Sequence, residues 1–255
     1  MELVIVERSG AVATLTLNRP EAKNALSHPL MKRLHEALWD LEKDGAVRAV
    51  ILSGGPGGFS AGADIKEMDG ASAQALARDP HLSHWDYVGQ YPKPLVAAVS
   101  GFAFGGGLEL ALACDMIVCG ETARLGQPEI NIGVIPGAGG TQRLARALGK
   151  ALASELVMTG RPLSARRAYD LGLVNRVVSD ETVLAEARRL AAEIAARPPL
   201  AVQAAKRAIL AAAEKPLSES LQIERRLFYS LFETQDQKEG MRAFIEKRQP
   251  VFSGR

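Results

Sequence analysis

The sequence predicts an α/β fold that ends in a helical region. Short apolar runs bounded by Gly, Pro or Ser alternate with helical segments up to about residue 180, and runs of this kind are typical of strands covered on both faces. Such alternation favours right-handed βαβ crossovers. The chain has 255 residues, which suggests one large domain or one domain with an appendage.

The N-terminal elements are the clearest. Residues 2–8 and 11–17 are β-rich, and Ser9-Gly10 between them predicts a hairpin. A helix follows, because Ser27 is a suitable N-cap and leucines then recur every three or four residues. These leucines are Leu30, Leu34, Leu38 and Leu41.

Later strands are expected at 47–52, 95–99, 116–118 and, more weakly, 174–178. Asp180 is expected to cap a helix over 181–196, and Pro198-Pro199 then breaks the chain. Two or three further helices run to about residue 248. Their apolar side chains either pack on the core or form an oligomer interface, and the pattern alone favours neither. These side chains are Leu217, Leu221, Leu227, Phe228, Leu231, Phe232 and Phe244.

Composition and charge exclude several classes of protein. The formal net charge is +2, from 31 basic and 29 acidic residues, which argues against nucleic acid or an anionic membrane as the main partner. Cys114 and Cys119 lie in one apolar stretch with neither zinc-ribbon nor redox spacing, so we expect buried thiols in a reducing compartment. The N-terminus lacks a basic leader, and the longest uncharged run, 94–108, is fifteen residues, against about 20 for a membrane helix. We expect a cytoplasmic protein without a membrane span.

Glycine is concentrated in three places. Twelve of the 24 glycines lie in 54–62, 101–107 and 137–140. Because glycine lets the main chain approach a ligand closely, the clusters suggest backbone contact with a bound molecule. Tight turns are the alternative for each cluster.

Known glycine motifs do not explain these clusters. Gly137-Ala-Gly139 has Gln142 where a dinucleotide fingerprint needs glycine, and Gly149-Lys150 lacks the hydroxyl residue of a phosphate loop. Gly58-Phe-Ser-Ala-Gly62 matches a nucleophile elbow, but a hydrolase triad of this type needs a histidine late in the chain. All four histidines precede residue 85, and we interpret them as surface or packing residues, with no metal site. They are His28, His35, His81 and His84.

Two carboxylates are candidates for acid–base chemistry. Glu109 is the only charge in an otherwise apolar helical segment, so it needs a partner, a proton or a cavity. An ion pair with Arg124 or Arg143 is the structural alternative. Glu129 lies in the turn-rich stretch 126–133 and on its own resembles a solvated loop residue. Two carboxylates at one substrate can act as acid and base, but a separation of 20 residues does not establish that they meet.

The chain resembles the crotonase superfamily, and within it the enoyl-CoA hydratases, from about residue 2 to the end. The matching segments are Leu17-Asn-Arg-Pro20, Asn24-Ala-Leu26, Phe59-Ser-Ala-Gly-Ala-Asp-Ile-Lys-Glu-Met68, Gly105-Gly-Gly-Leu-Glu-Leu-Ala111, Gly126-Gln-Pro-Glu-Ile130 and Ile135-Pro-Gly-Ala-Gly-Gly-Thr-Gln-Arg-Leu144. The resemblance implies a crotonase-like spiral of β-β-α turns at 1–197, with CoA binding and catalysis. It implies a helical trimerisation region at 198–255, in a homo-trimer or a hexamer built as a dimer of trimers.

The resemblance also assigns site residues. It implies an oxyanion hole for the thioester made by the backbone N–H groups of Ala63 and Gly106, and makes Ser60 a turn residue. In this interpretation Glu109 chiefly orients and deprotonates the water that attacks Cβ, and Glu129 supplies the proton to Cα. The alternative is that the two glutamates share these roles, because a coupled pair titrates as a unit. Expected contacts to CoA or substrate are Lys23, Ala61, Gly62, Ala63, Asp64, Ile65, Gly106, Pro136 and Gly137, with Lys23 and Lys66 as candidates for the phosphates.

The favoured activity is therefore that of a hydro-lyase: reversible syn hydration of a trans-2-enoyl-CoA to a 3-hydroxyacyl-CoA, as in fatty acid β-oxidation. No separate cofactor is expected, because CoA is part of the substrate. Enzymatic alternatives are Δ3,Δ2-enoyl-CoA isomerisation and hydration of a specialised ester such as dehydroadipyl-CoA in aromatic-acid catabolism, decided by an acyl pocket walled by 70–90 and 130–140. A non-catalytic acyl-CoA- or RNA-binding relative is the alternative from another class, and the 11 basic against 7 acidic residues of 197–255, without an aromatic stacking pattern, argue against RNA.

Overall fold

A six-stranded sheet forms the centre of the molecule in the computed structural model, which describes residues 2–255. Its strand order is β1-β2-β3-β4-β6-β9. The first two strands form the predicted antiparallel hairpin, with Val4 opposite Leu17, and every later pair is parallel. The strands are β1 (Val4–Ser9), β2 (Val12–Leu17), β3 (Ala49–Ser53), β4 (Leu95–Val99), β6 (Met116–Gly120) and β9 (Arg176–Val178).

A smaller sheet of three strands lies beside the first. It has the order β5-β7-β8, with bounds Phe102–Phe104, Arg124–Gly126 and Leu163–Ser164. The chain steps from β4 in the large sheet to β5 in the small one and then into helix α5 (Gly106–Ala113), and β6, β7 and α6 (Gly140–Thr159) repeat this step. These repeated β-β-α turns confirm the predicted spiral.

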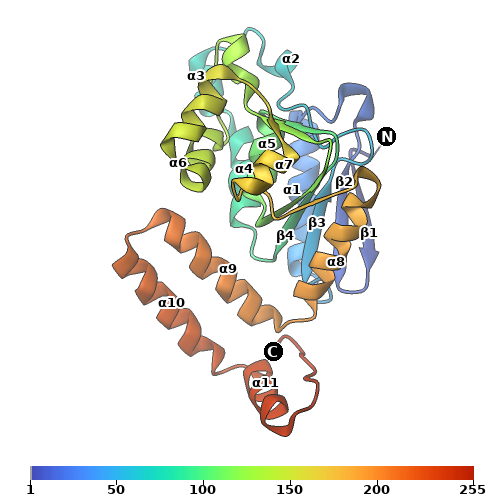
Figure 1. The fold of residues 1–255 in the computed structure, drawn as a ribbon, viewed down its shortest axis with the longest axis vertical. Helices are drawn as coiled ribbons and strands as arrows, with labels where there is room; N and C mark the ends of the chain where they lie inside the picture. The colour runs from blue at the N-terminus through green and yellow to red at the C-terminus, as the bar shows by residue number, and fades with distance from the viewer. Residues whose placement is uncertain (1) are drawn as a thin grey trace.

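Helices cover both faces of the large sheet (Figure 1). Helix α8 packs on β2, β3, β4 and β6 from one side, while α1 packs on β1 and β2, and α4 packs on α1 and α5. The remaining helices of the body are α1 (His28–Lys43), α2 (Ile65–Met68), α3 (Ala73–Arg78), α4 (Ser83–Gln90), α7 (Ala165–Asp170) and α8 (Val183–Ala195). Short 3-10 turns occur at Pro20–Ala22, Pro80–Leu82, Pro128–Ile132 and Asp180–Thr182.

The periodic leucines of α1 behave as predicted. Ser27 caps the helix by accepting a hydrogen bond from the N–H of Leu30, and the four leucines of its apolar face are buried in the main core. A second core lies between the sheet and α8. Both cores consist mainly of aliphatic side chains, as the low aromatic content of 5% requires.

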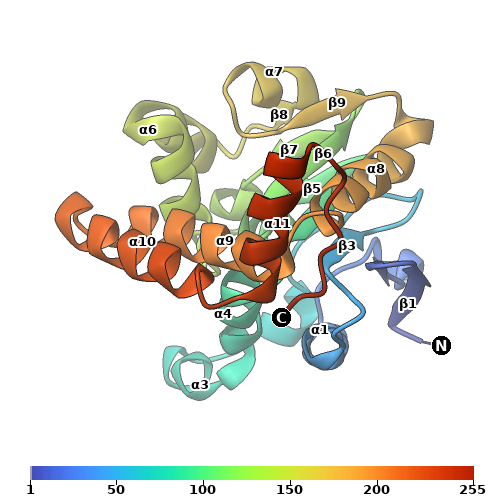
Figure 2. The same cartoon turned by 90° about the horizontal axis from the view of Figure 1, so that it is seen from below.

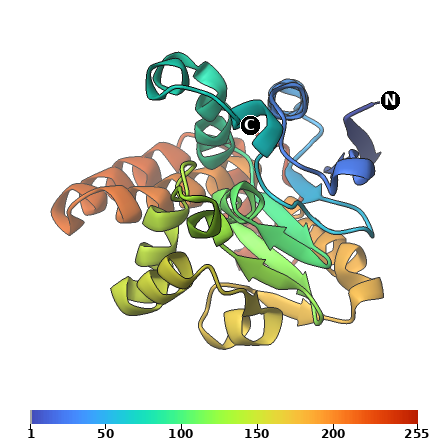
Figure 3. The same ribbon diagram turned by 90° about the horizontal axis from the view of Figure 1, so that it is seen from above.

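The last three helices extend away from the body (Figures 1 and 2). Helices α9 (Pro199–Glu214) and α10 (Leu217–Leu231) lie side by side, and α11 (Gln235–Glu246) turns back under them. Seen from above, the orange α9 and α10 reach past the body to one side (Figure 3). The predicted break at Pro198-Pro199 and the three helices after it are confirmed.

A buried ion pair attaches α9 to the body. The Lys206 Nζ atom lies 2.8 Å from the Asp115 carboxylate, and the two side chains are only 6% and 19% exposed. Lys206 also donates to the carbonyl of Lys93 at 3.0 Å, and Lys93 in turn donates to the carbonyls of Leu41 and Asp44. Lys206 and Lys93 thus connect α9 to the segment before β4 and to the end of α1.

One predicted helix cap is wrong. The helix after Ser179 opens as a 3-10 turn and the α-helix proper begins at Val183, with no side-chain cap on either segment. The Asp180 carboxylate instead accepts hydrogen bonds from the hydroxyl and N–H groups of Thr122, across the β6–β7 turn. Asp180 therefore joins two loops rather than capping a helix.

The predicted burial of the two cysteines is confirmed for Cys119, whereas Cys114 is half-buried, and both are free thiols. Burial raises the pKa of each thiol to about 12, so both remain unreactive at neutral pH. In the described part of the chain no helix combines the length and the apolar character that crossing a bilayer requires.

The Lys206–Asp115 pair provides a test of how α9 is held. We expect Lys206→Met to lower the free energy of unfolding by about 3 kcal/mol, because it leaves a buried carboxylate without its cation. Arg166→Met, which breaks the exposed pair of Arg166 with Asp170, should change it by less than about 0.5 kcal/mol. Urea unfolding followed by circular dichroism measures both, and equal losses would contradict the assignment.

Candidate active site

Glu109 is held by the start of another helix. Its side chain is 3% exposed and comes from α5, the predicted apolar helix. One carboxylate oxygen, Oε1, accepts hydrogen bonds from the N–H groups of Ala138 at 2.8 Å and Gly140 at 2.7 Å. These N–H groups belong to the N-terminus of α6, where the helix dipole also favours a negative charge.

Neither Arg124 nor Arg143 forms an ion pair with Glu109 among the described residues, which rules out the structural alternative. Burial raises the pKa of Glu109, while the hydrogen bonds from Gly140 and Ala138 and the charge of Arg143 act in the opposite direction. The partner that a buried carboxylate requires is thus backbone.

Glu129 lies at the same site but in different surroundings. It belongs to the 3-10 turn Pro128–Ile132, and its Oε1 atom would lie only 3.0 Å from a Cβ atom placed on Gly105. Gly105 has φ +50° and directly precedes α5, so glycine here both permits the turn and leaves room for the carboxylate. Burial raises the pKa of Glu129 to about 7, and the charge of Glu109 adds to the increase. The structure therefore brings the two predicted glutamates together.

Gln127 is a functional candidate that sequence reasoning missed. Its side chain is fully buried and, with the amide nitrogen turned toward Glu129, it donates to both carboxylate oxygens at 2.9 and 3.1 Å. Its amide also lies against Gly140, one of the donors to Glu109. No property of the sequence around 126–129 distinguishes this amide from an ordinary loop residue.

Two free backbone donors lie beside the glutamates. A Cβ atom on Gly106 would be 3.2 Å from the amide nitrogen of Ala63, so these two main-chain segments are adjacent. Within residues 2–255 neither amide donates to a protein acceptor. Trp85 closes this side, because its ring would lie 3.4 Å from the same Cβ. The pair of free N–H groups has the form of an oxyanion hole.

The loop that carries Ala63 is fixed by buried polar groups. The Asn24 side chain donates to the carbonyls of Gly54, Gly58 and Phe59. Ser60 is fully buried, donates to the Asn24 carbonyl and accepts from the N–H of Gly62. It is therefore a turn residue and not an exposed nucleophile. An ion pair of 2.6 Å between Arg19 and Asp64 ties the far end of the loop.

The other predicted contact residues fall into two groups. The carbonyl of Lys23 accepts from the N–H of Ala61 at 3.0 Å, so the first group, Lys23 and 61–65, is one surface next to the free amide of Ala63. Pro136 and Gly137 lie in the loop that delivers Ala138 and Gly140 to Glu109. The phosphate contacts expected of the Lys23 and Lys66 side chains remain predictions.

The four histidines contact one another and nearby carboxylates. His28 binds the carboxylates of Glu67 and Asp79, both at 2.9 Å, and His35 lies against His84. Within the part of the chain that the structure describes, no three His, Cys, Asp or Glu side chains group to hold a metal ion.

Known proteins resemble this chain in sequence and in architecture. The family model described as enoyl-CoA hydratase/isomerase matches residues 7–255. A probable enoyl-CoA hydratase of Rhizobium meliloti is 50% identical over 254 residues, covering 100% of this chain and 99% of the relative. The mitochondrial enoyl-CoA hydratase of Pongo abelii is 49% identical over 98% of this chain and 88% of its own length.

Solved structures agree. An enoyl-CoA hydratase subunit I from Geobacillus kaustophilus superposes with a TM-score of 0.97 at 44% identity, over 99% of this chain and 98% of the other. An enoyl-CoA hydratase from Polaromonas sp. JS666 gives 0.93 at 36% identity, over 98% and 99%. By sequence, fold and site together, this chain belongs to the enoyl-CoA hydratase/isomerase family.

Proposed function

We propose that this protein is a hydro-lyase that reversibly adds water to a trans-2-enoyl-CoA to give a 3-hydroxyacyl-CoA. The observation that carries the proposal is the arrangement of two glutamates, Glu109 buried and Glu129 half-buried, beside the two free amide N–H groups of Ala63 and Gly106. A thioester carbonyl placed on the two amides presents its Cα and Cβ atoms to the carboxylates. CoA arrives as part of the substrate, so the reaction needs no separate cofactor.

The different surroundings of the two glutamates support a division of roles between them. Glu109, held by two backbone donors, is the base that removes a proton from water as the water oxygen bonds to Cβ. The electrons of the double bond move to the thioester oxygen, where the Ala63 and Gly106 amides stabilise the enolate by roughly 2.7–4 kcal/mol per donor. Glu129, with its raised pKa, carries the proton that is delivered to Cα. Different environments around paired carboxylates are the usual basis of such a division.

The names of the relatives do not agree on one acyl chain for the substrate. Besides the hydratases named above, the 2,3-dehydroadipyl-CoA hydratase of Escherichia coli is 44% identical over 255 residues. Trp85, from the predicted acyl wall 70–90, lies beside the free amides. A panel of enoyl-CoA esters that differ in chain length and in terminal charge, compared by kcat/KM, separates a fatty acid β-oxidation substrate from a dicarboxylic one. The proposal fails if no ester is hydrated.

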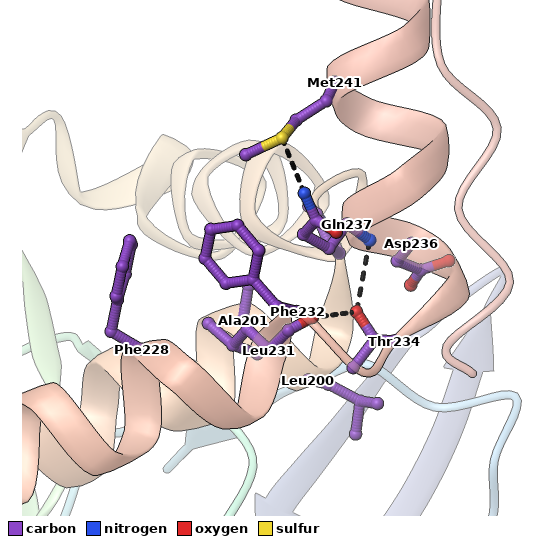
Figure 4. A pocket seen from close by; sticks show the side chains of 10 residues that line it. Leu200, Ala201, Phe228, Leu231, Phe232, Thr234, Asp236, Gln237 and Met241 are labelled. Atoms are coloured by element: carbon purple, nitrogen blue, oxygen red, sulfur yellow. Dashed lines mark hydrogen bonds between the residues drawn. The ribbon is translucent and has the colours of Figure 1, made fainter.

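We further propose that the helical region assembles the protein into trimers, alone or paired as hexamers. Helices α9–α11 and the tail expose many large apolar side chains, and α9, α10 and α11 surround an apolar hollow in which Phe232 stands over Ala201 and Leu231 (Figure 4). Such a surface is unusual on a monomer. The most exposed of these side chains are Ile209, Leu217, Tyr229, Phe244, Ile245 and Val251.

The acid–base assignment predicts two inactive variants. Glu109→Gln and Glu129→Gln should each reduce kcat for hydration of crotonyl-CoA by about 10²–10⁴-fold, the usual contribution of a general acid or base, with little change in fold. Loss of enoyl absorbance measures the rate. Glu121→Gln, at an exposed turn, should retain full activity. Near-normal turnover in either active-site variant would refute the assignment.

The pH dependence follows from the raised pKa of Glu129. The reactive enzyme holds one proton between the two glutamates in both directions, because hydration only transfers it from Glu129 to Glu109. The profile of kcat/KM should therefore be a bell whose alkaline limb, where Glu129 loses its proton, falls near pH 7. Hydration and dehydration should give the same bell. A kcat/KM profile that stays flat from about one pH unit below this limb to about two units above it is incompatible with Glu129 as the acid.

The assembly proposal predicts a mass that is a multiple of three chains of 27.2 kDa in sedimentation or light scattering. Phe244→Asp, at a side chain 86% exposed, should shift the protein toward smaller species, because it places a charge in an apolar interface. Met158→Asp, at an apolar side chain on α6 that is 72% exposed, provides the comparison. A monomeric wild-type protein would disprove the proposal.

A further inference from the structure

Arg143 is a half-buried cation without a partner. It lies in the first turn of α6, three residues after Gly140. Its Nε atom is buried and finds no acceptor, and no carboxylate in the described part of the chain pairs with its guanidinium. A half-buried cation without a counter-ion loses part of its hydration without compensation, so its position calls for an explanation beyond packing.

Two glycines make the space that the Arg143 side chain occupies. A Cβ atom on Gly89 would lie 2.6 Å from Nη2, and one on Gly139 would lie 3.2 Å from Nε. Gly89 is buried within α4, where glycine costs about 1 kcal/mol relative to alanine. The glycine therefore serves to admit the guanidinium. From the first turn of α6 the Arg143 side chain passes Gly139 and reaches Gly89 of α4.

This position places the arginine charge beside Glu109. The amides of Ala138 and Gly140, which hold the Glu109 carboxylate, flank Gly139, against which Arg143 packs. The charge of Arg143 lowers the pKa of both Glu109, within α5, and Cys114, directly after the end of α5. The side chain therefore lies against α4, at Gly89, and close to α5.

We propose that Arg143 is a positioning residue for Glu109: its guanidinium, fitted between Gly89 and Gly139, keeps that carboxylate ionised and fixed at the start of α6. The inference rests on the proposed function, because it explains how the base of the hydration is held in its charged form. Arg143 does not touch the substrate in this scheme.

Other ionisable groups around Glu109 do not supply this charge. Glu129, from the turn Pro128–Ile132, interacts electrostatically with Glu109 and carries a charge of the same sign. From α4, His84 interacts with charged neighbours on α1 and before α4 instead. Asp115, after the end of α5, is paired with Lys206, and β5 carries only Phe102, Ala103 and Phe104. Arg143 is thus the cation that acts on Glu109 among the described residues.

The test compares pH profiles. In Arg143→Met the acid limb of kcat/KM, where Glu109 gains a proton, should move up by about one pH unit, so that activity falls about tenfold on the acid side and much less at the optimum. Arg143→Lys should move it less than half as far, because it keeps the charge. Arg146→Met removes the same charge from the same helix at an exposed site and should leave the limb in place.

A second readout needs no turnover. The pKa of Glu109 can be measured in substrate-free protein from the ¹³C carboxyl signal that Glu109→Gln removes, and it should rise in Arg143→Met. Where the methionine variant fails to fold, Arg143→Gln gives the same comparison. A uniform loss of rate at all pH values, or an unchanged Glu109 pKa, overturns the proposal. If wild-type protein hydrates no ester, the proposed function fails instead, and the carboxyl titration alone decides the role of Arg143.

Discussion

The hydrogen bonds between the Glu109 carboxylate and the N-terminus of α6 organise the rest of the site. They satisfy a charge that would otherwise be costly in the apolar helix α5, and they fix two β-β-α turns against each other, since α5 closes one turn and α6 the next. Gln127 extends the same connection to Glu129, because its amide lies between Gly140 and the second carboxylate. One buried charge therefore couples the fold of two turns to the position of the second glutamate.

The glycine clusters show how backbone can be both exposed and precisely placed. Gly62 has φ +112°, and a Cβ atom on it would lie 2.9 Å from the carbonyl of Phe104, so the two main chains approach as closely as glycine allows. This approach brings the amides of Ala63 and Gly106 together. Buried polar side chains then prevent the loop from moving, Asn24 by three hydrogen bonds and Ser60 by two. Close approach comes from glycine, and rigidity comes from the groups around it.

Much of this could be predicted from local patterns, and the rest depends on contacts that local patterns do not encode. The leucine spacing of α1, the hairpin and the buried strands follow from periodicity, which is a property of consecutive residues. That Glu109 and Glu129 meet was implied by family resemblance alone, because a separation of 20 residues is compatible with any distance. The same limit explains one error, since Asp180 bonds Thr122 across a turn rather than capping its helix. It also explains why the partner of Glu109 stayed open, because the backbone N–H groups that hold Glu109 are carried by every residue but proline.

Burial differs between the inner part of the site and the outer part of the segment expected to contact the acyl chain. Glu109, Gln127 and Trp85 are nearly inaccessible, whereas α2, α3 and the turn Pro80–Leu82 contain no buried residue. His28 connects this outer segment to α1 through the carboxylates of Glu67 and Asp79, exposed contacts that contribute little stability. Segments with few buried contacts open at low free-energy cost. Glu109 and Gln127 therefore lie in a well-packed frame, and the outer segment beside it can change its side chains or its position without disturbing them.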